Sequence, residues 1–303
     1  MPLHLIDGPT LRSTLSMRAA VDALERALLD HPTPTGPVRS STPAGHGEIL
    51  LMPATGAATS GVKVIALHPG NPARGLPFVQ GVYVLFDTDT LAPRALIDAA
   101  ELTRIRTASI SALGARYLAR PESSTMVVFG TGVQAEAHVE ALRAVLPITR
   151  VTIVGRRREA ADELAARLAV DGLEIAAGDA ETVTDADVVC TCTSTTEALF
   201  EDAWIKPGTH IAAIGSYLPE RREVPAATVA RARVAVDDIE GALAEAGDLL
   251  RAIAEGSFAA DRILCDLPGL VRGATVRTSP ADVTLFKAVG SAFEDLIVAS
   301  AVA

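Results

Sequence analysis

The chain has 303 residues, of which 49% are hydrophobic and 21% charged, so it can bury one large core or two medium ones. Its 37 acidic and 27 basic residues give a formal net charge of −10. This balance excludes general binding to nucleic acid or to an anionic membrane surface, because both need clustered Lys and Arg. Any anion that the chain binds must be held by a few local bases.

The first third of the sequence predicts one helix followed by a strand meander. Apolar residues at helical spacing predict an amphipathic helix over 16–29 that Ser16 caps. Four short strands separated by turn-rich segments are expected at 48–52, 62–67, 79–86 and 94–97. These gaps are too short for parallel crossovers, so the sheet is predicted to be antiparallel. A helix is expected from 99 to about 118.

From residue 125 onward, buried strands alternate with helices, the pattern of a parallel, doubly wound sheet. Strands are expected at 125–129, 151–154, 174–177, 188–192, 210–214 and 234–236. Helices are expected after the first two strands, through about residue 146 and over about 158–170. A final helix is expected over about 281–301; Lys287, Glu294 and Asp295 interrupt its apolar run, so no membrane span is predicted.

The three cysteines, Cys190, Cys192 and Cys265, have no metal-ligand spacing and leave one thiol over in any pairing. A reduced, cytoplasmic setting is therefore expected, without a metal site. The N-terminus has no basic segment followed by an apolar run, so no signal peptide is predicted.

The run Gly130-Thr131-Gly132-Val133-Gln134-Ala135 stands between a buried strand and an Ala-rich helix. Two glycines permit a tight turn and close approach to a pyrophosphate, and the helix start offers free N–H groups to that anion. In this context the motif predicts dinucleotide binding by a Rossmann fold. Glu136 and His138 on the following helix are expected at the surface rather than as ligands.

The second strand of this region ends in Gly155-Arg156-Arg157-Arg158, where an NAD enzyme usually has an acid for the ribose 2′-hydroxyl. Arginine pairs instead with a 2′-phosphate, so NADPH is favoured over NADH, with Arg156 and Arg157 as the contacts. The alternative is three solvated arginines, which a helix N-terminus disfavours unless an anion is bound.

Three bases of the first part of the chain, Arg39, Lys63 and Arg106, lie in constrained settings. Lys63 interrupts an apolar strand, where a buried charge needs a partner. Arg106 lies in a helix of otherwise small and apolar residues. Each base alone is typical of a sheet edge or a salt bridge, whereas together they would suit an anionic substrate.

The chain resembles the ornithine cyclodeaminase/μ-crystallin family in segments spread over nearly its whole length. In the order of the family these are Gly61-Val62-Lys63-Val64, Asn71-Pro72, Gly75-Leu76-Pro77, Leu85-Phe86-Asp87, Leu102-Thr103, Arg106-Thr107-Ala108, the glycine run from Gly130 to Ala135, 204–210 and 282–290.

The resemblance implies a homodimer of two-domain chains: residues 1–112 with 279–303 form an α+β dimerisation and substrate-binding domain with an antiparallel sheet, and residues 113–278 form an NADP-binding Rossmann domain. It implies that Arg39, Lys63 and Arg106 bind the substrate carboxylate. It implies cofactor contacts at Arg106, Thr107, the glycine run, Thr193, Ser194, Ile214 and Thr284. From their sequence positions, Met52 and Tyr217 are expected to line the substrate pocket.

The chain departs from ornithine cyclodeaminases at two positions. Tyr217 stands where those enzymes carry a catalytic Asp, and a Tyr cannot activate water near neutral pH as a carboxylate does. Arg156 follows Gly155 where they have an acid that holds NAD. Both departures resemble μ-crystallin, a ketimine reductase that uses NADPH, and bacterial reductases of cyclic imino acids.

We therefore predict an enzyme that reduces a C=N bond alpha to a carboxylate with NADPH. The substrate would be a small imino acid, such as Δ1-pyrroline-2-carboxylate or Δ1-piperideine-2-carboxylate, giving proline or pipecolate. Lys63 and Arg106 are the predicted catalytic residues; they orient the substrate, Lys63 or a water keeps the imine protonated, and the cofactor supplies the hydride. The alternatives are an ornithine cyclodeaminase, an alanine dehydrogenase and a non-catalytic NADPH-dependent binding protein.

Overall fold

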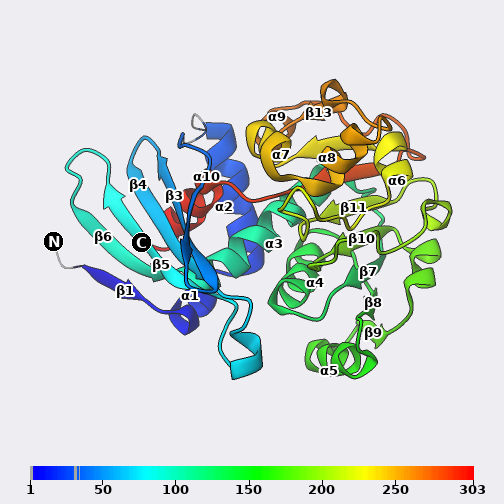
Figure 1. Ribbon diagram of the computed structural model, residues 1–303, viewed down its shortest axis with the longest axis horizontal. Coiled ribbons are helices and arrows are strands. Elements are labelled where there is room, and N and C mark those ends of the chain that lie inside the picture. The colour runs from blue at the N-terminus through cyan, green and yellow to red at the C-terminus, as the bar shows by residue number, and fades with distance from the viewer. Residues whose placement is uncertain (1–2, 31–32, 34) are drawn as a thin grey trace. The chain divides into compact units, whose positions relative to one another are not determined.

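A computed structural model describes residues 3–30, 33 and 35–303 (Figure 1). Their contacts divide the chain into two compact units: unit 1 comprises residues 1–106 and 291–303, and unit 2 comprises residues 107–290. The sequence placed these boundaries after residue 112 and before residue 279. The second boundary lies at residue 291 rather than at residue 279, because residues 284–287 form a strand in the sheet of unit 2. In the part of the chain that the structure describes, no helix is long and apolar enough to cross a membrane.

Unit 1 contains a six-stranded sheet in the order β1-β6-β5-β4-β3-β2. Its strands are β1 (His4–Ile6), β2 (Ser40–Ala44), β3 (Gly47–Thr55), β4 (Thr59–Leu67), β5 (Val79–Asp87) and β6 (Pro93–Asp98). Only the short β1 runs parallel to its neighbour, so the predicted antiparallel meander is confirmed. The sequence did not predict β1 or β2, because neither has the apolar alternation of a half-buried strand.

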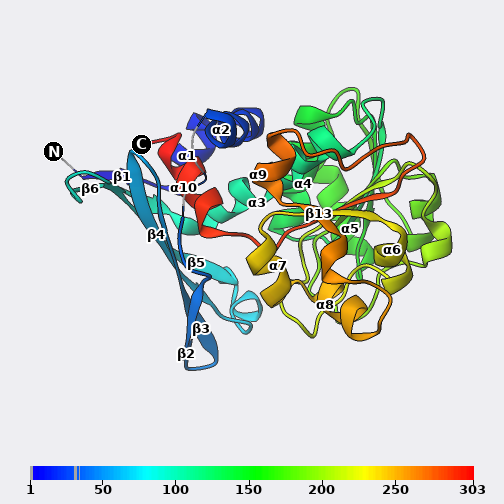
Figure 2. The same cartoon turned by 90° about the horizontal axis from the view of Figure 1, so that it is seen from above.

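Helices α1 (Gly8–Thr14), α2 (Met17–Asp30) and α10 (Ala292–Ser300) gather on one side of this sheet (Figure 2). The predicted first helix is α2, and Ser16 Oγ accepts a hydrogen bond from the Ala19 amide at 3.2 Å. Nearly all of α10 is buried, including two acidic side chains. A 3-10 turn, η1, covers Pro72–Arg74.

Helix α3 (Ala99–Leu118) begins in unit 1 and continues into unit 2 from residue 107. Both its ends agree with the sequence prediction. It carries two of the residues expected at the site, Arg106 and Thr107.

Unit 2 contains an eight-stranded, wholly parallel sheet in the order β13-β12-β14-β11-β10-β7-β8-β9. Its strands are β7 (Thr125–Phe129), β8 (Arg150–Val154), β9 (Glu174–Ala177), β10 (Val188–Thr191), β11 (His210–Ala213), β12 (Arg233–Val236), β13 (Ile263–Cys265) and β14 (Thr284–Lys287). Strands β8 and β9 extend the sheet from β7 in one direction and β10 onward in the other, so the doubly wound fold is confirmed. Ligands of such sheets bind at the carboxyl ends of the strands, where this order reverses.

The helices of unit 2 begin with the two that the sequence predicted, α4 (Val133–Val145) and α5 (Arg158–Leu168). The others are short: α6 (Ala226–Arg231), α7 (Ile239–Glu245), α8 (Gly247–Ala254), α9 (Leu267–Val271) and the 3-10 turns η2 (Ala180–Asp185), η3 (Asp202–Trp204) and η4 (Ala260–Arg262). Aliphatic side chains of the strands form the core with Phe129 and Phe200, whose rings are 5.7 Å apart.

The expectation of one helix over about 281–301 is wrong in its first half. The segment Thr284–Lys287 is β14, which lies between β11 and β12 with every side chain buried. An apolar run of this length fits a buried strand as well as a helix, and Thr and Phe favour the strand. Gly290, at φ +83°, separates the strand from α10.

Candidate active site

A row of side chains crosses the buried face of the sheet of unit 1. In register, Met52 on β3 is opposite Lys63 on β4, and Lys63 is opposite Tyr83 on β5. All three side chains are buried, and Lys63 and Tyr83 have no exposed surface. Met52, expected in the substrate pocket, thus lies beside the lysine expected to bind the substrate.

Lys63 and Arg106 are held by two neighbouring acids on α10. Lys63 Nζ donates to Asp295 Oδ1 at 2.9 Å, and Arg106 Nη1 donates to Glu294 Oε2 at 2.9 Å. Arg106 Nε is 3.0 Å from the same Asp295 Oδ1. Glu294 and Asp295 have no exposed surface, and Arg106 is 5% exposed. The four groups form one buried charge cluster that links β4, α3 and α10.

The predicted bases act on one another electrostatically. Burial lowers the pKa of Lys63 to about 8, and the positive charges of Arg106 and Arg39 also lower it, while Asp295 opposes them. The half-buried Arg39 is therefore close enough to belong to the same charge cluster. The three predicted bases thus lie close enough to influence one another, as a site for a carboxylate requires.

Sequence reasoning missed Glu294, Asp295 and Tyr83. Two adjacent acids inside the apolar run 292–299 were the signal for the first two, since buried acids need basic partners. Burial, together with the Asp295 carboxylate, raises the pKa of Tyr83, so its phenol stays neutral. No described residue accepts or donates a hydrogen bond at the Tyr83 hydroxyl.

In unit 2, the glycine run lies at the end of β7, next to β10. Gly130 has φ +121°, and a Cβ there would lie 2.6 Å from the Cys192 carbonyl oxygen, so only glycine fits. Gly132 is the N-cap of α4, without a side-chain cap, and a Cβ there would meet nothing within 4 Å. This exposed helix start fits the pyrophosphate of a dinucleotide.

The predicted contacts Thr193, Ser194 and Ile214 follow β10 and β11 at the same edge of the sheet, and the buried Glu223 ties these strand ends together. Glu223 Oε1 accepts hydrogen bonds from the amide and hydroxyl of Thr193 at 2.6 and 2.7 Å. Its Oε2 accepts one from the Gly215 amide at 2.7 Å. Burial and the neighbouring Asp248 raise the pKa of Glu223. No sequence motif indicates this role of Glu223.

Asp248 on α8 holds the segment that carries Glu223. Its Oδ1 accepts hydrogen bonds from the amides of Glu223 and Val224 at 2.7 and 2.9 Å, and its Oδ2 accepts one from Ser216 Oγ. Lys287 Nζ at the end of β14 lies 3.3 Å from Asp248 Oδ2. The carboxyl edge of the sheet is therefore supported by buried polar groups as well as by apolar packing.

Arg156 and Arg157 are exposed after β8, at the start of α5. Among the residues that the structure describes, neither arginine side chain has a hydrogen-bond or ion-pair partner. Arg158 differs, because it donates to the Ala177 carbonyl at 3.0 Å and to Asp162 at 3.4 Å. The first two arginines of the run are thus available to an anion and the third is engaged.

Thr284 and Tyr217 are the remaining predicted site residues. Thr284 begins β14, opposite His210 at the start of β11, so it lies at the amino edge of the sheet and not with Gly130, Thr193 and Ile214. Its hydroxyl donates to the Leu118 carbonyl at 3.0 Å, which is a structural role at the edge opposite the expected cofactor. Tyr217 is half-buried, and the Arg221 guanidinium lies 5.1 Å from its ring centre.

The expectation that His138 lies at the surface is wrong, because its side chain has no exposed surface. It lies in the second turn of α4, which faces the sheet. Its Nδ1 is 2.7 Å from the Gln134 carbonyl oxygen and its Nε2 is 3.0 Å from Ser111 Oγ. Glu136, two residues earlier on the same helix, is half-buried.

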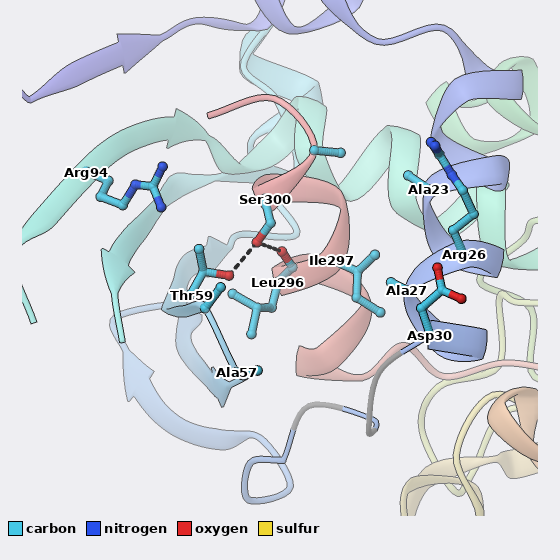
Figure 3. A pocket seen from close by; sticks show the side chains of 13 residues that line it. Ala23, Arg26, Ala27, Asp30, Ala57, Thr59, Arg94, Leu296, Ile297 and Ser300 are labelled. Atoms are coloured by element: carbon cyan, nitrogen blue, oxygen red, sulfur yellow. Dashed lines mark hydrogen bonds between the residues drawn. The ribbon is translucent and has the colours of Figure 1, made fainter. Parts of the chain in front are cut away.

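Unit 1 also has an open pocket of about 540 Å³ between α2, α10 and the turn from β3 to β4 (Figure 3). Alanines and the apolar side chains Leu296 and Ile297 form much of its wall, with Arg26, Asp30 and Arg94 at its border. Thr59 Oγ1 and Ser300 Oγ are hydrogen-bonded at 2.7 Å. None of the predicted site residues lines this pocket, so it is not the candidate active site.

Comparison with known proteins gives one family. The family model described as the ornithine cyclodeaminase/mu-crystallin family matches residues 10–303. A Delta(1)-pyrroline-2-carboxylate reductase of Paracoccus denitrificans is 37% identical over 308 aligned positions, which cover 95% of this chain and 92% of the relative.

Two solved structures are similar over their full lengths. Delta(1)-pyrroline-2-carboxylate reductase of Thermococcus litoralis, in complex with NADH and L-proline, has a TM-score of 0.94 and 31% identity, covering 99% of this chain and 96% of the other. An archaeal alanine dehydrogenase dimer with bound NAD has a TM-score of 0.93 and 30% identity. The match covers 100% of this chain and 95% of the alanine dehydrogenase chain.

Proposed function

The chain belongs to the ornithine cyclodeaminase/mu-crystallin family, and from this premise we propose that it reduces the C=N bond of a cyclic imino acid, with NADPH as hydride donor. Δ1-Pyrroline-2-carboxylate is the proposed substrate and proline the product. The observation that carries this function is the buried charge cluster of unit 1, in which Lys63 and Arg106 are bonded to Asp295 and Glu294, with Arg39 nearby. The reductases among the similar proteins support the same reaction.

The substrate carboxylate is bound by Arg39, Lys63 and Arg106. Asp295 and Glu294 bond to Lys63 and Arg106 and hold their charged groups in place. Ammonium and guanidinium groups held near one another suit a carboxylate, which forms charge-assisted hydrogen bonds with them. Met52 lies beside Lys63 and offers an apolar surface to the ring of the substrate.

Lys63 is also the proposed proton donor. A protonated imine accepts hydride more readily than a neutral one, so a proton held near the substrate nitrogen speeds the reaction. With a pKa of about 8, Lys63 Nζ is protonated at neutral pH and gives up its proton more easily than an ordinary lysine. Asp295 holds Nζ in place at 2.9 Å.

The cofactor is proposed to be NADPH rather than NADH. The glycine run accepts the pyrophosphate, and the 2′-phosphate is bound by Arg156 and Arg157, whose exposed side chains have no partner among the described residues. Thr193 and Ile214 lie at the same carboxyl edge of the sheet. Glu223 accepts a hydrogen bond from the Thr193 amide, and the Thr191 carbonyl accepts one from the Ile214 amide. When bound, the reduced nicotinamide supplies the hydride.

The active form is proposed to be a homodimer. The face of the unit 1 sheet opposite Lys63 carries Leu5, Ile49, Leu51 and Val82, which are 40–76% exposed. A contiguous apolar face of this kind marks a protein interface, and a second copy of the chain offers the same face. Light scattering should report a dimer that Val82→Asp dissociates, while Val170→Asp, an equally exposed control in unit 2, leaves it intact.

The three cysteines are free thiols, two of them buried. We propose that the protein works in the cytoplasm, where such thiols stay reduced.

Alanine dehydrogenation is the second candidate, because the archaeal alanine dehydrogenase is nearly as similar in structure as the reductase. The same charge cluster would bind the carboxylate of pyruvate or alanine. The two candidates differ in the nitrogen substrate: a preformed cyclic imine or free ammonium.

The experiment is a set of rate measurements with purified protein. NADPH oxidation is followed with Δ1-pyrroline-2-carboxylate, with Δ1-piperideine-2-carboxylate and with pyruvate plus ammonium, and each is repeated with NADH. We expect turnover of a cyclic imine with NADPH. Turnover of pyruvate and ammonium alone would select the second candidate. Release of ammonia from ornithine without net NADPH consumption would contradict both.

A further inference from the structure

Two thiols and one imidazole meet at the carboxyl edge of the sheet of unit 2. Cys190 and Cys192, at the end of β10, have their Sγ atoms 3.5 Å apart. With a ring nitrogen of His138 on α4, these atoms all lie within 4.8 Å of one another. Cys190 and His138 are buried and Cys192 is half-buried. None of the three has a part in the proposed reaction.

The hydrogen bonds of His138 determine which nitrogen is free. Its Nδ1 is 2.7 Å from the Gln134 carbonyl oxygen, which can only accept, so Nδ1 carries the proton of the neutral ring. The lone pair is therefore on Nε2, on the side of Ser111 Oγ at 3.0 Å. An imidazole whose second nitrogen donates to a backbone carbonyl is the usual arrangement of a metal-binding histidine.

The charges of the three side chains match those of a divalent cation. Two thiolates and one neutral imidazole carry a charge of −2, which a divalent cation balances. A neutral complex can be buried without the cost of an isolated ion.

The sulfur separation distinguishes a metal site from a disulfide. Two thiolates on one tetrahedral zinc ion, each about 2.3 Å from it, are about 3.8 Å apart, close to the observed 3.5 Å. A disulfide requires about 2.05 Å, and the Cα atoms of residues i and i+2 on a strand, about 6.6 Å apart, are at the upper limit for one. The existing geometry thus needs little movement to bind zinc.

We propose that Cys190, Cys192 and His138 form a zinc site, with the Ser111 hydroxyl or a water as the fourth ligand. The ion would join the end of β10 to α4 beside Gly130, whose Cα packs against the Cys192 carbonyl. Sequence spacing alone does not predict this site, because the histidine comes from a helix far from the cysteines in the chain. The two thiol protons pass to solvent as the ion binds.

The first test uses the unmodified chain. Protein stripped with a chelator under reducing conditions is titrated with zinc alone, and then with cobalt(II) as a spectroscopic substitute. We expect one zinc per chain, release of about two protons, and thiolate-to-cobalt charge-transfer absorption. No retained zinc, or a cobalt spectrum without thiolate bands, would overturn the proposal.

The second test assigns the ligands. Cys190→Ala, Cys192→Ala and His138→Gln should each weaken zinc binding by at least about 100-fold, more than the loss of an outer-shell partner usually costs. Cys265→Ala, in β13 outside the cluster, is the matched control and should bind zinc as the parent does. Equal zinc affinity in Cys192→Ala and the parent would overturn the proposal. If a variant does not fold, the cobalt spectrum of the parent tests the proposal instead.

Discussion

The charged groups that carry the proposed function differ between the two units in their exposure to solvent. Lys63 and Arg106 in unit 1 are 0 and 5% exposed and are bonded to buried acids. The side chains of Arg156 and Arg157 in unit 2 are exposed, with no partner among the described residues. Buried charges depend on one another, because removing one leaves its partner uncompensated. Exposed arginines act singly and are screened by salt.

This difference predicts two kinds of mutant. A change in the cluster of unit 1 should alter stability, pKa values and turnover together. A change in the arginine pair of unit 2 should alter only the affinity for the cofactor. Four measurements follow from it.

Lys63→Met should have the largest effect, because it removes a carboxylate contact and the proposed proton donor at once. We expect kcat/KM for the imino acid to fall by about 10²–10⁴-fold, the usual range for a general acid. Stopped-flow or steady-state rates of NADPH oxidation measure it. Lys206→Met, at a partly exposed lysine of unit 2, is the control and should keep its activity.

Arg106→Leu removes the guanidinium that Glu294 and Asp295 contact and should cost about 3–5 kcal/mol of stability, measured by chemical denaturation. Its KM for the imino acid should rise by about 100-fold, the value of a lost hydrogen bond between charges. Arg106→Lys keeps the charge and should recover most of the stability but not the KM. Loss of NADPH affinity in either variant, with an unchanged KM for the imino acid, would mean that Arg106 serves the cofactor instead.

The double variant Arg156→Ala/Arg157→Ala should bind NADPH about 10- to 100-fold more weakly and NADH equally well, because only NADPH has a 2′-phosphate. Folding should be unchanged, since both side chains are exposed. Fluorescence titration at two salt concentrations measures the affinity for each cofactor. The NADPH affinity of the parent should fall more steeply with salt than that of the variant. Arg167→Ala, another exposed arginine of α5, is the control.

The smallest of the four expected effects is the pH dependence of kcat/KM. Because the pKa of Lys63 is lowered from 10.5 to about 8, its charged form is present below pH 8 and is lost above it. The value of kcat/KM should therefore be level on the acid side of pH 8 and fall about tenfold per pH unit on the alkaline side. An activity that stays level to pH 10 would show that Lys63 is not the proton donor.

The sequence predicted the elements whose pattern is local. Helix α3, strand β7 and the glycine run with its exposed helix start all follow from periodicity and from neighbouring residues. The bases of unit 1 were also found, because a charge such as Lys63 inside an apolar strand requires a partner.

The partners themselves could not be predicted, since they come from distant segments. Asp295 meets Lys63 from the other end of the chain, and Glu223 ties Thr193 to Gly215 from a loop without a motif. His138 looked like a surface residue because the face of α4 that packs on the sheet is set by tertiary structure. Strand β14 was missed for the same reason: pairing with β11 and β12 decides between strand and helix.

The most direct test of the account compares two imines that differ only in the carboxylate. NADPH oxidation is measured with Δ1-pyrroline-2-carboxylate and with Δ1-pyrroline, the same ring without the acid group. If the charge cluster of unit 1 binds the carboxylate, the first compound should have a kcat/KM at least about 10²-fold higher, the value of one or two hydrogen bonds between charges, and give proline. Equal rates for the two rings, or no oxidation of NADPH by either, would contradict the central claim.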